Sequence, residues 1–460
     1  MGYLGAMRAG ALAIALSLVP ATAQAETLGS ALTSAYLNNP EIMSALLNVK
    51  ATAENIALAK SAKLPSIGVS GTFGGSWTAP QGGDVFTALG STAGINYSQT
   101  LFDNFKTEAD IEQARAGTEL SKYALRNVEQ NILFSVVQAY YAVIRDTQLV
   151  QLRQDNMAFY DAQLTSAEDR LRLGEGTKID VSQAQTRQIA GVALYQSAIA
   201  SLQTSQASYE RYVGHKPRNL VYDFNFGKSL PTSIDAGIAS AEDRHPALLA
   251  ARAAIRVAQA GSDAASAAFG PTLSLIGSIE TSIAYASERV PQPAGTASDL
   301  TGSAQLRLSV PLYSGGALSA SLRKANIQQI QSEVDALGAF DTVKEAVISS
   351  WSTLQNAISQ IQSAEAAVAS AELVVEGTIQ ERDVGQKTTL DVLNAQAEYS
   401  TAREALISAR TTRMVAAFAL LAASGRLSPD VLGLNIPVHS ADGYIATVED
   451  VWLELRALDE

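Results

Sequence analysis

The sequence predicts an α+β membrane protein built by tandem duplication, in which each half supplies two membrane-spanning β-strands and a long antiparallel helical hairpin. Three observations support this prediction. Landmarks recur in register along the 460 residues, four segments alternate polar and apolar residues, and prolines are missing from residues 81–216 and 312–428. Proline is common in turns and disfavoured inside helices, so such gaps indicate long uninterrupted helices.

The composition excludes several classes of protein. The chain has no cysteine, which excludes disulfide scaffolds, thiolate metal sites, cysteine nucleophiles and a lipoprotein anchor. Its formal net charge of −12 argues against the basic surface that nucleic-acid binding requires. We therefore expect no nucleic-acid partner.

The N-terminus predicts export from the cytoplasm. Arg8 precedes an apolar run over residues 9–19, and the small residues Ala23 and Ala25 complete a signal peptide over residues 1–25. A membrane anchor is the alternative, but the run is shorter than the roughly twenty residues needed to span a bilayer. No later segment is continuously apolar over that length, so we expect any membrane-embedded part to consist of β-strands.

The two halves of the chain correspond position by position. Asn38–Ile42 recurs as Arg244–Leu248, and Leu64–Ser66 recurs as Gly270–Thr272, both at an offset of 206 residues. Later landmarks recur at an offset of 211: Leu101 and Leu312, Tyr140 and Trp351, Gly174 and Gly385, Asp180 and Asp391, Gly214 and Gly425. We therefore expect two similar halves packed side by side.

These landmarks divide the chain after the signal peptide into four parts. The first repeat covers residues 26–216, with strands at about 64–77 and 92–102 and helices at about 103–173 and 177–213. A linker covers residues 217–240. The second repeat covers residues 241–428, with strands at about 271–285 and 301–313 and helices at about 316–384 and 388–424. A C-terminal segment covers residues 429–460.

The expected strands have a period of two. In the first strand Ile67, Val69 and Phe73 alternate with serine, threonine and glycine, and the segments 78–91 and 286–300 between strands have the composition of external loops. This pattern suits a transmembrane barrel, although a soluble sheet with one wet face is an alternative. Four strands cannot close a barrel, so the sheet must be shared between chains. The residues alone leave a dimer with eight strands and a trimer with twelve both open.

The expected helices are unusually long. A continuous helix over residues 103–173 would extend roughly 106 Å. In the second half, apolar and small residues recur every three or four positions over residues 343–375, and again over 392–409. Gly174 and Gly385 lie where the chain must reverse direction. Each half therefore predicts an antiparallel helical hairpin that turns at a glycine.

No catalytic or metal-binding arrangement is expected. His215, His245 and His439 are scattered and lack the spacing of metal ligands. Residues 174–178 superficially resemble a phosphate-binding loop, but the lysine follows the threonine and the G-x-x-x-x-G-K-[ST] pattern is absent. We therefore predict that the protein is not an enzyme and has no cofactor or metal.

The two hairpin turns carry the most specific pattern, LGEGTKIDV over residues 173–181 and VGQKTTLDV over residues 384–392. With the signal peptide and the duplication, they resemble the TolC family of outer-membrane efflux ducts over nearly the whole exported chain. The resemblance implies a homotrimer in outer-membrane lipid, with a twelve-stranded β-barrel above a twelve-helix periplasmic α-barrel. It also places the linker and the C-terminal segment in a belt around the helical barrel.

The same resemblance implies a passive duct, gated at its periplasmic end, in a tripartite efflux pump or a type I secretion system. Its partners would be a periplasmic adaptor (membrane fusion protein) and an inner-membrane RND or ABC transporter. An exported periplasmic adaptor and a structural coiled-coil protein are the two alternatives. The cargo, whether drugs, metals or secreted proteins, is not indicated by the sequence.

The resemblance also assigns roles to residues at the turns. Asp391 would form a ring of carboxylates at the closed aperture, and Asn394 replaces a second carboxylate found in relatives. Asp180 and Lys387 would help hold the closed state through polar links. Adaptor contact is expected at Leu173, Gly174, Val384, Gly385 and Thr388. Helix capping is an alternative role for the two aspartates, as is ordinary turn geometry for the glycines.

Overall fold

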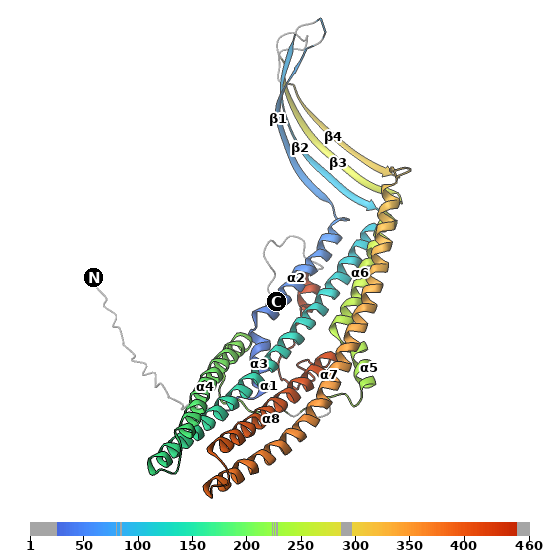
Figure 1. Cartoon of the computed structure of the whole chain (residues 1–460). Coiled ribbons are helices and arrows are strands. Elements are labelled where there is room, and N and C mark those ends of the chain that lie inside the picture. Colours follow the sequence, from blue (N-terminus) through green and yellow to red (C-terminus); the bar gives the residue numbers. More distant parts are fainter. Residues whose placement is uncertain are drawn as a thin grey trace, which may run out of the picture.

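The computed structural model describes residues 25–79, 81–82, 85–222, 224, 226, 229–286 and 297–448. The predicted signal peptide lies outside these residues except for Ala25, as do the last twelve residues of the C-terminal segment. The described chain is elongated, with a curved β-sheet at one end and two helical hairpins that reach toward the other (Figure 1).

The elements follow one another in two matching series. The first comprises α1 (Leu28–Asn38), α2 (Pro40–Ser61), β1 (Ser66–Thr78), β2 (Phe86–Phe102), α3 (Lys106–Leu173) and α4 (Lys178–Val213). The second comprises α5 (Ile234–Arg244), α6 (Pro246–Ala267), β3 (Thr272–Ala286), β4 (Ala297–Ser309), α7 (Ala317–Asp383) and α8 (Thr389–Ala423). A short helix, α9 (Asp442–Val448), lies in the C-terminal segment.

Equivalent capping residues begin the helices of both halves. Asn39 ends α1 and caps α2, and His245 ends α5 and caps α6; a proline occupies the first turn of both α2 and α6. Each cap side chain accepts a hydrogen bond from a backbone N–H that the helix leaves unpaired. Asn39 and His245 are separated by the offset of 206 found in the sequence. The duplication therefore extends to the chemistry of the helix ends.

The structure corrects the expected number of helices. We expected two in each half, and the described chain has four in each. The reason is length: α3 has 68 residues and α4 only 36, while α7 has 67 and α8 only 35. Each returning helix pairs with the half of its partner that lies away from the sheet. The halves of α3 and α7 nearer the sheet need other neighbours, which α2 and α6 supply (Figure 1).

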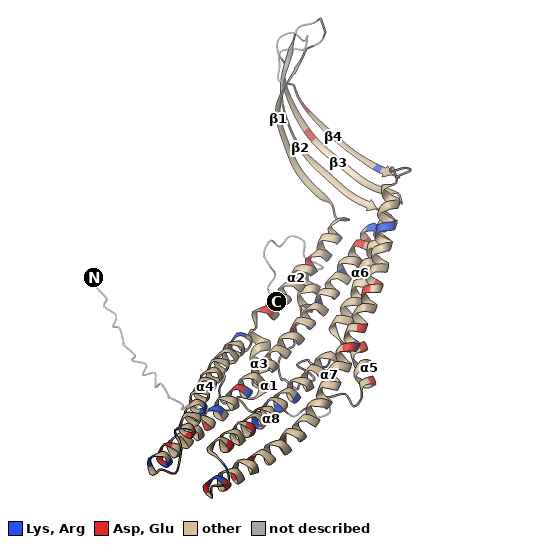
Figure 2. Cartoon of the chain, in the orientation of Figure 1, with Lys and Arg blue, Asp and Glu red and all other residues tan. Residues whose placement is uncertain are grey.

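The four strands form one antiparallel sheet in the order β1-β2-β3-β4. Apolar residues pair with apolar residues on one face, as in Ile95 opposite Ile279. Hydroxyl and amide side chains meet on the other face, where the hydroxyl oxygens of Thr72 and Thr92 lie 2.6 Å apart. Figure 2 shows how few charged residues the sheet carries. An amphipathic sheet of this kind suits a lipid surface on one side and water on the other.

Two strands begin earlier than expected. β2 begins at Phe86 rather than near residue 92, and β4 begins at Ala297 rather than near residue 301. Residues 86–91 belong to β2 because they pair in register with β1, from Phe86 opposite Thr78 to Ser91 opposite Phe73. The connections expected over residues 78–91 and 286–300 are correspondingly shorter. Glycine, alanine and serine in these stretches concealed the strands.

One helix departs from the expectation that no later segment could span a membrane. Among the described helices, α8 is long and apolar enough to do so by composition alone. Its apolar residues are nevertheless used within the protein, since Leu393, Phe418, Leu420 and Leu421 are fully buried. Its composition is therefore explained by packing against α3 and α7.

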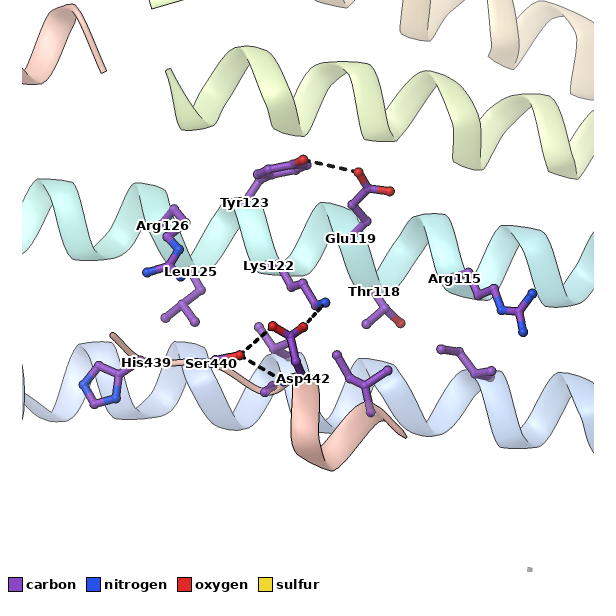
Figure 3. Close-up of a pocket in the computed structure, with 14 residues that line it drawn as sticks. Arg115, Thr118, Glu119, Lys122, Tyr123, Leu125, Arg126, His439, Ser440 and Asp442 are labelled. Carbon is purple, nitrogen blue, oxygen red and sulfur yellow. Dashed lines mark hydrogen bonds and ion pairs between the residues drawn. The ribbon is translucent and has the colours of Figure 1, made fainter. Parts of the chain in front are cut away.

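The C-terminal segment is held against α2 and α3 (Figure 3). His439 stacks on Tyr36 with ring centroids 4.7 Å apart, and Asp442 forms an ion pair with Lys122 of α3. The Tyr444 hydroxyl donates a hydrogen bond of 2.6 Å to Glu54 of α2. The segment lines a pocket of about 480 Å³ in which Lys122 and Asp442 pair with each other, while Glu119 and Arg126 pair with residues outside the lining. This pocket is best explained as the seat of the segment.

Candidate functional site at the helical tips

The turns of the two hairpins lie at the end of the molecule farthest from the sheet, and charged residues gather there (Figure 2). We call these turns the tips: residues 173–181 form the first and residues 384–392 the second. Gly174 and Gly385 have φ angles of 78° and 80°, in the left-handed region that favours glycine. Leu173 and Val384 beside them are 74% and 71% exposed. Turn geometry thus accounts for the glycines, whereas the exposed apolar side chains have no such explanation.

Each tip aspartate completes a capping box at the start of the returning helix. Asp180 Oδ2 accepts hydrogen bonds from the backbone N–H and the hydroxyl of Thr177, at 3.0 and 2.7 Å. Asp391 Oδ2 accepts the same two bonds from Thr388, both at 2.8 Å. The alternative capping role is therefore present at both tips. Because these bonds use only Oδ2, capping does not prevent the other oxygen from facing a pore.

The second tip keeps its carboxylate charged. Hydrogen bonds from the backbone and side chain of Thr388, together with the nearby Lys387 ammonium, lower the pKa of Asp391 below its ordinary value. The group is therefore ionised at neutral pH.

The structure separates two of the predicted aperture residues and gives a third a partner. Within one chain Asp180 and Lys387 do not pair, since the hydrogen bonds of Asp180 are formed with Thr177. A link between these residues in neighbouring copies stays a prediction. Asn394 accepts a hydrogen bond of 2.9 Å from Arg187 of α4. The asparagine predicted to stand in place of a second ring carboxylate therefore joins the two hairpins.

Sequence reasoning missed a buried arginine near the second tip. Arg382 of α7 is only 9% exposed. Its Nη1 donates to Gln163 of α3 at 2.5 Å, and its Nε and Nη2 donate to Asp383 at 3.0 and 2.7 Å. Gln163 lies 219 residues away along the chain, so no local pattern could reveal the pair.

A second polar contact between the hairpins lies farther from the tips. Asn156 Oδ1 of α3 accepts hydrogen bonds from Gln396 at 2.9 Å and from Ser400 at 2.7 Å, and all three side chains are buried. We call these three residues the amide node. Leu393 packs beside it against Tyr160 of α3. Polar and apolar contacts thus hold the two hairpins of one chain together in this structure.

This arrangement defines an outer-membrane channel protein, and comparisons with known proteins agree. The profile of the outer membrane efflux protein family matches residues 31–215 and 237–426. Outer membrane efflux protein BepC of Brucella suis is 35% identical and aligns with 98% of this chain and 97% of its own. Outer membrane protein TolC of Vibrio cholerae is 27% identical over 92% and 96% of the two chains.

A solved structure shares the fold. The CmeC outer membrane channel of Campylobacter jejuni superimposes with a TM-score of 0.76 over 92% of this chain and 89% of its own, at 16% identity. The chain therefore belongs to the outer membrane efflux protein family, the TolC family, and is a protein of the outer membrane. The resemblance inferred from the tips is confirmed. The alternatives of an adaptor and a structural coiled coil are not supported, and the family is one of channels rather than enzymes.

Proposed function

We propose that three copies of this chain form an efflux duct, continuous from the outer membrane into the periplasm and gated at the helical tips. The observation that carries the proposal is that the chain has matching unfilled edges on its two sides. β1 and β4 lie at opposite edges of the described sheet, each with one strand neighbour. Two edges that complement one another allow head-to-tail contact, which closes into a ring when the rotation permits.

Exposed apolar side chains follow the same two sides. On one side α7 exposes Ile327, Ile330, Val334 and Leu337. On the other side α2 exposes Met43, Leu47 and Leu58. Apolar surface of this extent on helices is typical of an interface. Three copies give twelve strands and an open lumen, whereas the eight strands of a dimer leave a lumen that side chains fill. A duct therefore favours the trimer.

The tips would close the duct. Three copies of Asp391 converging on a narrow pore would favour cations and repel one another. Opening requires the hairpins to move apart, which breaks the Arg187–Asn394 and Arg382–Gln163 hydrogen bonds. We expect Asp180 and Lys387 to add links between neighbouring copies. The closed state is then a balance between these links and the repulsion of the carboxylates.

The partners follow from the passive nature of such a duct. A passive duct does not supply energy for transport, so an inner-membrane RND or ABC transporter would drive transport through a periplasmic adaptor. The tips offer the adaptor exposed apolar side chains at Leu173 and Val384, next to Gly174, Gly385 and Thr388. Similarity to an efflux protein over nearly the full length favours efflux over protein secretion.

Assembly and selectivity test the proposal together. The protein extracted from outer membranes in detergent should have the mass of a trimer, and should form cation-selective channels in planar bilayers. Asp391→Asn keeps an oxygen for the capping box but removes the charge, so it should lower the cation selectivity. Glu175→Gln, which removes a charge from the first tip, is the control. A soluble monomer, or unchanged selectivity in Asp391→Asn, would contradict the proposal.

The links between the hairpins can be tested separately. Arg187→Ala and Arg382→Gln should each lengthen the open periods of single channels, because each removes a link of the closed state. Arg172→Ala is a matched control, since Arg172 pairs with Asp169 of its own helix. Equal effects of all three substitutions would show that the links do not hold the gate.

A further inference from the structure

The turn between β2 and α3 has an unusual backbone. Asn104 and Phe105 have φ angles of 55° and 66°, in the left-handed region that side chains other than glycine rarely adopt. The equivalent residues of the second half, at the offset of 211, are Gly315 and Gly316, with φ angles of 59° and 83°. Both halves therefore build the same turn. Only the first half keeps side chains there, which indicates that those side chains have a use.

Asn104 joins the two halves of the chain. Its amide Nδ2 donates a hydrogen bond of 3.0 Å to the carbonyl of Ala267, the last residue of α6. The side chain also occupies the space beside Gly270, where an added Cβ would lie 2.1 Å from Asn104 Cγ. A residue larger than glycine cannot be placed there while Asn104 holds its position. Asn104 and Gly270 therefore form a pair matched in size.

The residues equivalent to Asn104 and Gly270 in the other half of the repeat have the sizes reversed. Gly315 replaces Asn104 on the turn, and a Cβ added to Gly315 would meet nothing within 4 Å in the same chain. Leu64 replaces Gly270 at the offset of 206, and this leucine is 49% exposed. Gly315 thus leaves space beside it in its own chain, and Leu64 leaves part of its bulky side chain uncovered. The two residues lie on opposite sides of one chain, and only a second copy can bring them together.

We propose that Leu64 of one copy packs over Gly315 of the next, so that the contact between copies repeats the internal contact of Asn104 with Gly270. The inference rests on the proposed trimeric duct and names a contact that closes it. The partner is a second copy of this chain. Within the chain, α3 packs against α6; between copies, the equivalent pair is α7 and α2, both of which expose apolar side chains.

The same repeat predicts how the strands pair between copies. Within the chain, the β1–β2 pair Ser66 and Ser98 becomes the β3–β4 pair Thr272 and Ser309 when the two offsets are applied. The offsets therefore hold throughout the sheet.

Applied to the β2–β3 pairs, the offsets predict the pairs between β4 and β1 of the neighbouring copy. The internal pair of Thr92 and Ser282 corresponds to Ser303 of one copy opposite Ser76 of the neighbouring copy. In the same way, the internal pair of Ile95 and Ile279 corresponds to Leu306 of one copy opposite Phe73 of the neighbouring copy. Polar residues meet polar and apolar residues meet apolar in this register, as they do within the chain.

Disulfide trapping tests the register, because the natural chain has no cysteine. The variant carrying both Ser76→Cys and Ser303→Cys should form covalent dimers and trimers on non-reducing gels after oxidation in the membrane. In the control, Ser76→Cys is combined with Ala304→Cys, which lies one residue along β4 and on the opposite face. Crosslinking of the control, or none in the first variant, would overturn the register.

A compensating pair of substitutions tests the packing of Leu64 on Gly315. Gly315→Asn should reduce the trimer fraction in detergent by about tenfold or more, because the new side chain collides with Leu64 of the next copy. The fold of a single chain should tolerate it, since Asn104 adopts the same backbone conformation. Adding Leu64→Gly should restore the trimer by recreating the internal pair.

The outcomes separate this inference from the proposed function. A natural protein that is not a trimer contradicts the duct itself. A trimeric natural protein in which Leu64→Gly fails to rescue Gly315→Asn overturns the contact and leaves the duct standing. Leu64→Gly alone should have a smaller effect than Gly315→Asn, since it removes bulk without creating a collision.

Discussion

Replacing Asn156 with alanine should loosen the hairpins from one another. The substitution removes the oxygen that accepts hydrogen bonds from Gln396 and Ser400 inside the buried amide node. Ser400 keeps a partner, because its hydroxyl also lies 2.8 Å from the carbonyl of Gln396. One buried donor, Gln396 Nε2, is therefore left unpaired. Such a group costs about 1–3 kcal/mol, which lowers the free energy of local opening near the tips by the same amount.

Amide hydrogen exchange at the start of α8 measures this change directly. A loss of about 1–3 kcal/mol in local stability corresponds to exchange roughly 5 to 150 times faster over residues 393–400. Gln188→Ala is the control, since Gln188 donates a hydrogen bond of 2.9 Å to Asp161 on the exposed surface. Unchanged exchange in Asn156→Ala, or an equal change in the control, would refute the reasoning that the buried node holds the hairpins together.

Three further predictions follow from particular residues. Gly425→Ala should abolish folding, because the Cβ of the alanine would lie 2.6 Å from the backbone nitrogen of His245. Gly214→Ala at the equivalent turn should remain folded, because its Cβ would have no atom within 4 Å. The yield of trimer in membranes compares the two variants. The cation selectivity due to Asp391 should be fully present at neutral pH and lost in acid, since hydrogen bonds from Thr388 lower the pKa of Asp391 and the charge disappears only as the pH falls through the pKa; a decline between pH 8 and pH 7 in bilayer recordings would contradict the assignment. Tyr140→Phe should destabilise the protein to denaturant by about 1–3 kcal/mol, because the buried hydroxyl bonds to Glu26 and Val221.

The duplication and the tips could be predicted because their signals are local or strictly periodic. The turn glycines, the aspartates near the helix starts and the alternation in the strands each act over a few residues. The helices α2 and α6 were missed even though Asn39 and His245 stand before prolines, a common start of a helix. In the sequence, Asn39 and His245 indicate the repeat but not by themselves that a helix starts there. The unequal lengths of α3 and α4 explain why helices are needed at these positions.

The contacts between the hairpins could not be predicted from the sequence. Arg382 and Gln163 are ordinary polar residues on helices predicted to pack as coiled coils, and their hydrogen bond joins positions 219 residues apart. The amide node is likewise formed by residues about 240 positions apart. Side chains of this kind acquire a role from their neighbours in space, and a single sequence does not show which residues those neighbours are.

The central position of α3 and the peripheral position of α7 have a genetic consequence. α3 is enclosed by α2, α4, α6 and α8 of its own chain, so damage to it should reduce the amount of folded protein and behave as recessive. α7 has an exposed apolar side, which a neighbouring copy would cover in the proposed trimer. A chain altered there should fold, enter mixed trimers and spoil them. When the natural and altered genes are expressed equally, only about one trimer in eight would then contain three natural chains, so α7 is where dominant-negative alleles should arise.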